Sequence, residues 1–187
     1  MKIRFIYVMA LFSLLAGCAV GPQTVNVSPM LDFQNMKGVS VPVELVVEDE
    51  RNTPEVLGYR NAKNEGPITF DESLSKSMGE AIQSAMLAQN VEMERKPEPL
   101  SKVKVNIVKL RYSSPNKDWV SRVELEGEVV ISLQRGLASM TKRFSANRSQ
   151  DVATAPTQEF NQKFLNTLLS ELFNKAFNDK EVINFLK

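Results

Sequence analysis

The sequence predicts an α+β fold: a mixed, mostly antiparallel sheet of four to five strands with two long helices packed on one face. Several stretches alternate apolar and polar side chains, as strands with one buried face do. Two others repeat apolar side chains every three or four residues, which is typical of amphipathic helices. The order is strand, helix, short strand, three strands and helix, and it fits one α+β domain.

The first predicted strand follows the alternation of Val39–Val47. Pro42 lacks a backbone N–H, so this strand is expected at a sheet edge or at a bulge. The stronger strand at 102–112 buries Val103, Val105 and Ile107 and then changes parity. Such a change of phase predicts a β-bulge near its middle. A short strand is expected at 91–95.

Two more strands complete a predicted meander, over 119–134 and 140–151. Glutamates line one face of the first of these, while the preceding strand carries lysines and arginine. Opposite charges are therefore expected to pair across the hairpin. On the last strand Met140, Phe144 and Ala146 are expected to face inward.

The first predicted helix reaches about Gln89, with Thr69 or Asp71 as its cap. The last helix is expected to begin at Thr154 or Thr157 and to end near Asn178. Its apolar side chains cover a wide arc, which predicts that it is heavily buried. One or two further helical turns are expected at the C-terminus.

Composition excludes several functional classes. The 187 residues carry a formal charge of +1, so a nucleic-acid-binding surface is not expected. The chain contains no His and one Cys, which excludes Ser-His-Asp and Cys-His catalysis and an internal disulfide. Neither Gly-rich phosphate-binding motifs nor a calcium-binding loop occurs, so no cofactor and no metal site are expected.

The N-terminus predicts an exported, lipid-anchored protein. Lys2 and Arg4 precede an apolar run of about ten residues, which is the pattern of a secretory signal and is too short to span a bilayer. The run ends at 15–18, Leu-Ala-Gly-Cys, and this resembles the lipobox of bacterial lipoproteins. The resemblance implies a signal peptide at 1–17 and acylation of Cys18, and three acyl chains give durable anchoring. By the same resemblance, Ala19 in place of Asp implies sorting to the outer membrane.

The expected mature chain has two parts. Residues 18–37 are interpreted as the lipidated Cys and a flexible tether, and 38–187 as a single periplasmic domain. A polar segment at 49–68 is predicted to form a long loop, and loops of this length inside compact domains are often functional.

The whole chain also resembles the YajG-type lipoproteins of Gram-negative bacteria. The matching features are 15–18, the sequence Val-Asn-Val-Ser-Pro at 25–29, Gly-Val-Ser-Val at 38–41 and Asp-Glu-Arg at 49–51. These proteins are outer-membrane lipoproteins without an established activity. The resemblance implies a localisation and a domain type, and it carries over no catalytic residue.

Four residues are candidate contacts for a ligand or partner. Asp49 and Arg51 close the first strand, where anchoring of the following loop is the favoured interpretation. Tyr59 and Arg60 lie within that loop, and Arg suits recognition of anions such as phosphate. No catalytic residue is assigned. Glu124, Glu126 and Glu128 place three carboxylates on one strand face, but a solvated, ion-paired face is favoured over glycoside hydrolysis.

The expected function is a non-enzymatic binding or adaptor lipoprotein, facing the periplasm from the outer membrane. Its partners would be the membrane itself, through acyl chains on Cys18, and an envelope protein. A wall-glycan hydrolase using carboxylates and a periplasmic lipid carrier are the alternatives. A carrier would need an enclosed apolar cavity between helices and sheet.

Overall fold

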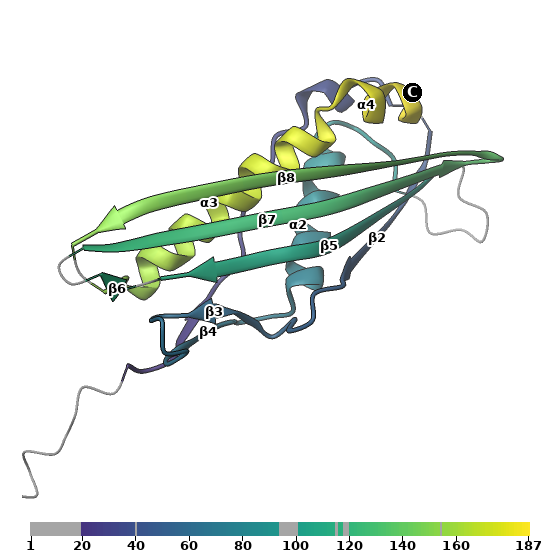
Figure 1. Ribbon diagram of the computed structural model, residues 1–187. Helices are drawn as coiled ribbons and strands as arrows, with labels where there is room; N and C mark the ends of the chain where they lie inside the picture. Colours follow the sequence, from purple (N-terminus) through teal and green to yellow (C-terminus); the bar gives the residue numbers. More distant parts are fainter. Residues whose placement is uncertain (1–19, 40, 94–100, 115, 118–119, 154) are drawn as a thin grey trace, which may run out of the picture.

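The protein is α+β, with helices on one face of a mixed sheet (Figure 1). The computed structural model describes residues 20–39, 41–93, 101–114, 116–117, 120–153 and 155–187. Its described part contains eight strands rather than the expected four to five. They are β1 (Gln23–Val25), β2 (Val43–Asp49), β3 (Val56–Tyr59), β4 (Pro67–Phe70), β5 (Ser101–Ser113), β6 (Asn116–Lys117), β7 (Val120–Arg135) and β8 (Ala138–Val152).

Strands β5, β7 and β8 form the predicted antiparallel meander, with β7 in the middle and β8 at an edge of the sheet. Strands β2 and β3 follow one another along the other edge of β5, both parallel to it. β3 continues into β4, and β1 adds parallel to β4. The supposed loop at 49–68 therefore holds β3 and the start of β4. Strands of three or four residues are too short to give a readable alternation, which is why the sequence pattern missed them.

Two details of the strand predictions are confirmed. The register of β5 against β7 shifts between Ile107 and Lys109, where the change of parity predicted a bulge. Among the named strands of the described part β2 pairs only with β5, so it lies at a sheet edge as Pro42 predicted, although it begins at Val43 rather than at Val39. Of the short strand expected at 91–95, Met93 forms an isolated parallel bridge with Val43, and residues 94–95 lie outside the described part.

Two helices, α2 (Leu74–Ala88) and α3 (Gln158–Phe177), carry most of the apolar side chains that cover the sheet, and α4 (Lys180–Leu186) follows. Thr157 caps α3 as predicted, its hydroxyl accepting from the N–H of Phe160. The predicted cap of α2 is wrong. α2 begins after Ser73, whereas the side chain of Asp71 accepts from the amide of Asn26. None of the described helices is both long and apolar enough to cross a membrane.

The core is filled where α3 crosses the sheet. Buried side chains of β7 face α3, and between them Gly127 lies against Leu168 and Leu172. A Cβ at Gly127 would stand 3.0 Å from Leu168 Cδ2 and 3.1 Å from Leu172 Cδ2. The absence of a side chain at this position therefore lets the helix approach the strand closely.

The segment 20–37, hereafter the N-terminal strap, differs from the predicted flexible tether. It contains β1 and the 3-10 helix η2 (Gln34–Met36), and it runs along α3. Five of its backbone N–H groups donate to side chains of α3 and its C-cap. The pairs are Asn26 with Gln162, Ser28 with Asn166, Met30 with Ser170, Asp32 with Asn174 and Asn35 with Asn178.

This pairing follows from matching repeats. Two residues of extended chain advance about 6.6 Å, and four residues of α-helix advance about 6.0 Å. From Asn26 to Asp32, every second N–H of the strap therefore meets a side chain one helical turn further along α3. Apolar side chains beside the hydrogen-bonded residues point inward, so Val25, Val27, Phe33 and Met36 are buried in the core.

We expect Phe33→Ala to lower the free energy of unfolding by about 3–5 kcal/mol, because a buried aromatic ring would be replaced by a cavity. Phe33 is 0% exposed and stacks on Phe177 with ring centroids 4.7 Å apart. Met30 lies in the same strap but is 84% exposed, so Met30→Ala is the matched control and should change stability by less than about 0.5 kcal/mol. Urea unfolding checks both variants. Equal, small effects would mean that the segment is a tether after all.

Candidate functional site

The edge of the sheet is interrupted where β2 ends and β3 has not yet begun. β2 pairs with β5 as far as Asp49 opposite Ile107, and β3 meets β5 at Gly58 opposite Tyr112. The intervening chain at 50–55 leaves the sheet at the level of the bulge in β5. The interruption opens a cleft of about 630 Å³.

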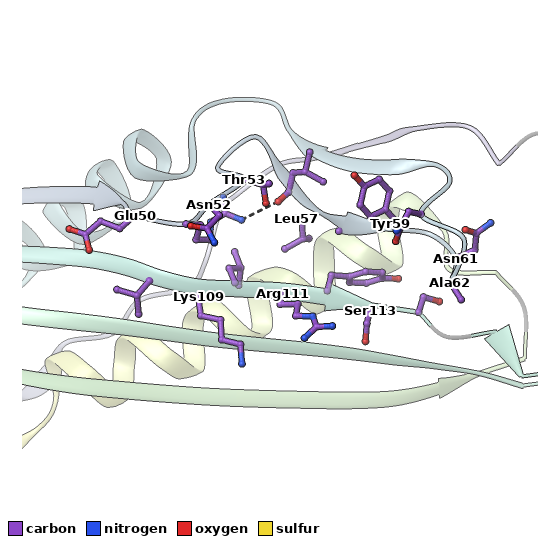
Figure 2. A pocket seen from close by; sticks show the side chains of 18 residues that line it. Glu50, Asn52, Thr53, Leu57, Tyr59, Asn61, Ala62, Lys109, Arg111 and Ser113 are labelled. Carbon is purple, nitrogen blue, oxygen red and sulfur yellow. Dashed lines mark hydrogen bonds between the residues drawn. The ribbon is translucent and has the colours of Figure 1, made fainter.

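Polar side chains surround this cleft (Figure 2). Glu50, Asn52 and Thr53 come from the chain between β2 and β3, and Lys109, Arg111 and Ser113 from the exposed side of β5. Leu57, Leu110 and Tyr112 form an apolar floor. The cleft thus offers amide, hydroxyl and cationic groups above an apolar base, a combination suited to binding a polar chain or small polar molecule.

Asp49 and Arg51 form a buried ion pair beside the cleft. Nε and Nη2 of Arg51 donate to the two carboxylate oxygens of Asp49 at 2.8 and 2.7 Å. The same guanidinium donates to the carbonyl oxygens of Pro54 at 2.6 Å and Val56 at 3.2 Å. Its carbon lies 5.2 Å from the centre of the Phe70 ring.

These contacts engage most of the donors of Arg51 with groups of the protein itself. The ion pair shapes the turn between β2 and β3, so the geometry supports the anchoring interpretation of Asp49 and Arg51 over direct binding. The chain turns out of the sheet after Asp49, and the turn brings Arg51 back to that carboxylate.

Tyr59 and Arg60, neighbours in sequence, are separated in function by the structure. Tyr59 lines the cleft and is 36% exposed. Arg60 instead donates through Nη1 to the carbonyl of Gly21 at 3.0 Å, so it holds the start of the strap. Asp49, Arg51 and Tyr59 therefore lie together around the cleft, whereas Arg60 joins the strap to β3.

Sequence reasoning missed the contribution of β5 to this site. Lys109 and Arg111 line the cleft because the bulge moves this half of the strand to a new register. The change of parity in β5 predicted the bulge. It did not predict that β2 would end beside that bulge and open a cleft there.

A buried chain of hydrogen bonds lies behind the cleft. The hydroxyl of Tyr112 donates to Asn161 Oδ1 at 2.8 Å, and Asn161 Nδ2 donates to Gln23 Oε1 at 2.7 Å. Gln23 in turn donates to the carbonyl of Pro156 at 3.2 Å. Burial raises the pKa of the Tyr112 hydroxyl to about 12, so the group stays neutral and serves a structural role at ordinary pH.

The three carboxylates of β7 are ion-paired. Glu126 contacts Lys109 at 2.5 Å, Glu124 contacts Arg122 at 3.4 Å, and Glu128 pairs with Arg143. The hydrogen bond and charge of Lys109 hold the pKa of Glu126 below its usual value, whereas a general acid in glycoside hydrolysis needs a raised pKa. Lys102 and Lys104 pair with Glu44 and Glu48 of β2 instead of with β7. Within the described ranges, no group of three potential ligands could hold a metal ion.

Comparison with known families places the chain among lipoproteins. A family model described as "Uncharacterized lipoprotein" matches residues 30–187. The chain belongs to this family, which confirms its resemblance to the YajG-type lipoproteins. The matched region begins inside the N-terminal strap. No curated protein matches the sequence.

One of three similar solved structures supports the fold. Protein XCC0632 from Xanthomonas campestris, of family DUF330, superimposes with a TM-score of 0.54 at 8% identity, covering 87% of this chain and 96% of that one. An uncharacterised protein gives 0.46 at 11% identity over 88% and 97%. The hypothetical protein CT253 from Chlamydia trachomatis gives 0.44 at 10% identity over 79% and 98%. The first of these shares the fold, and at such identity nothing further is transferred.

We expect Arg51→Lys to destabilise the protein by about 2–4 kcal/mol, because lysine cannot replace the two-pronged contact with Asp49 while also reaching two carbonyls. Arg111→Lys makes the same exchange on the exposed side of β5 and should change stability by less than about 0.5 kcal/mol. Urea unfolding compares the two. If Arg51→Lys also proved neutral, Arg51 would not anchor the turn.

Tyr112 should make stability depend on pH in alkaline solution. Its pKa is about 12 in the folded protein and 10.0 for an unperturbed tyrosine, so the folded state keeps a proton that the unfolded chain loses. The contribution is complete below pH 10 and disappears as the pH rises towards 12. Between pH 9 and pH 11.5, wild type should lose on the order of 2 kcal/mol more stability than Tyr112→Phe. Parallel losses in the two proteins, measured by urea unfolding, would contradict this.

Proposed function

We propose that the protein is a non-enzymatic binding lipoprotein, anchored to the outer membrane by acyl chains on Cys18 and facing the periplasm. Membership of a lipoprotein family supports the anchor, and Ala19 supports outer-membrane sorting. The cleft between β3 and β5 is the contact surface, and its occupant is a polar segment of an envelope protein. Cys18 and Ala19 lie outside the described residues.

The interrupted sheet edge is the observation that carries this proposal. Beside β5 the ladder to β2 stops at Ile107, and pairing resumes only at Tyr112. An extended segment of a partner is the natural ligand for such a gap, because it can form main-chain hydrogen bonds with an unoccupied strand edge. Tyr59 and the amides of Asn52 and Asn61 surround the gap. Exposed aromatic and amide groups are common in protein-binding surfaces.

The alternatives find less support. Glu124, Glu126 and Glu128 are each ion-paired, and Lys109 holds the pKa of Glu126 below its usual value, whereas a hydrolase needs a carboxyl group with a raised pKa. A lipid carrier needs an apolar cavity, but the apolar side chains of α2 and α3 belong to the same packed core as those of β5 and β7. The close approach of Leu168 and Leu172 to Gly127 leaves no gap there between helix and sheet.

Photocrosslinking in living cells tests the proposed contact. A benzophenone amino acid replaces Tyr59, and the same probe at Glu124, on the ion-paired face, is the control. We expect a protein adduct of discrete mass from position 59 and none from 124. The adduct should disappear in a Cys18→Ala background, because the unlipidated protein would not reach the outer membrane.

Other outcomes overturn the proposal in distinct ways. Adducts with lipid or glycan alone would favour a carrier or a wall-acting protein. No adduct from position 59, while the protein is folded and membrane-bound, would mean that the cleft is not the contact surface. Persistence of the same adduct in Cys18→Ala cells would mean that contact with the partner does not require acylation of Cys18.

A further inference from the structure

The place where the strap begins limits how the protein can sit on a membrane. Val20 lies against the turn between β3 and β4. A Cβ on Gly66 of that turn would be 2.7 Å from Val20 Cγ1, and Gly66 itself has a positive φ of 61°. Arg60 binds the carbonyl of Gly21, and Gln23 is buried in the hydrogen-bond chain behind the cleft. The chain is therefore held to the domain from about residue 21 onwards.

This contact leaves only a short free segment between Cys18 and the folded domain. The predicted tether of nineteen residues would reach up to about 65 Å, whereas the two steps from Cys18 to Val20 reach only about 7 Å. The hydrogen bonds from the strap to α3 prevent the remaining residues from lengthening that reach. Acyl chains on Cys18 would thus bring the β3–β4 turn to the lipid surface.

The opposite end of the domain is fixed by the register of the sheet. Gln134, next to the β7–β8 turn, pairs with Lys102 at the start of β5, whereas Gly58 pairs with Tyr112 near its end. β5 has 13 residues and so spans about 43 Å. The β3–β4 turn and the β7–β8 turn therefore lie at opposite ends of the sheet (Figure 1).

We propose that the acylated protein rests on the bilayer with residues 60–66 facing the lipid headgroups and the β7–β8 turn pointing about 40 Å away from them. The inference rests on the proposed acylation of Cys18. Residues 62–65 are all exposed, and they include Lys63 and Glu65, which suits a hydrated headgroup layer rather than insertion into the acyl chains. The exposed apolar side chain of Leu137 lies at the far turn, directed away from the membrane.

The orientation has a consequence for the cleft. The membrane-facing turn also forms part of the cleft, whose lining includes Asn61, Ala62 and Asn64. A partner bound there would lie beside the membrane surface. The cleft is therefore placed to bind an envelope protein that is itself anchored in the membrane, at a segment close to the lipid headgroups.

Energy transfer to the membrane surface tests the orientation. Azidophenylalanine replaces Lys63 or Leu137, a fluorescein is attached at the azide, and the acylated protein is placed in phosphatidylethanolamine–phosphatidylglycerol vesicles that carry rhodamine on some headgroups. Transfer from position 63 should exceed transfer from position 137 by at least about threefold, given their separation along β5. Equal transfer would overturn the proposed orientation.

A control variant isolates the short connection as the cause. Insertion of a long Gly-Ser linker between Ala19 and Val20 should bring the two transfer efficiencies to similar values, while the folded domain is unchanged. A difference that survives the insertion would overturn the proposal, because the connection would not then set the orientation.

Acylation is checked separately by the intact mass of the membrane-extracted protein. If Cys18 lacks acyl chains, the proposed function fails. The orientation is then measured on protein that begins at Cys18 and is coupled through its thiol to a maleimide lipid, so the two proposals fail independently.

Discussion

The N-terminal strap and α3 fit together because an extended chain and a helix repeat at nearly the same distance along their axes. Asn166, Asn174 and Asn178 each accept from a strap N–H and donate to a strap carbonyl, so these side chains replace the partner strand that the segment lacks. Buried apolar side chains of the strap then complete the core beneath α3. Through Gln23 and Arg60 the same segment is tied to the network behind the cleft and to the β3–β4 turn.

The cleft depends on a second constraint, the burial of Arg51 with Asp49. Removing two charges from water costs free energy, and such a pair is retained only when its geometry satisfies both partners. Here the carboxylate, two backbone carbonyls and an aromatic ring surround one guanidinium. This set of contacts fixes the path of the chain between β2 and β3. As a result, no strand among the described residues lies beside the β5 edge over the width of the cleft.

The exposed face of the sheet has a different character. Its charged side chains form pairs across neighbouring strands, including Lys104 with Glu48 and Lys109 with Glu126. Exposed pairs of this kind contribute little to stability individually, and their main effect is to keep the face hydrated. The long edge strand β8 carries charged residues as well, namely Lys142, Arg143, Arg148 and Asp151, and Lys175 of α3 donates to the Ser145 carbonyl. Charges along an edge strand discourage unwanted pairing with other chains.

Local sequence patterns were enough to predict the class of fold, the meander, the bulge in β5 and the cap of α3, because each depends on periodicity or on neighbouring residues. The sequence also identified the family, and it indicated the anchoring interpretation of Asp49 and Arg51. Tertiary structure decided the rest. Gln162, Asn166, Ser170 and Asn174 form a visible polar stripe on α3, yet their partner lies more than a hundred residues away. The cleft and the orientation of Tyr59 likewise arise from the gap between the end of β2 and the start of β3 along the edge of β5. No local sequence pattern predicts that these three segments meet.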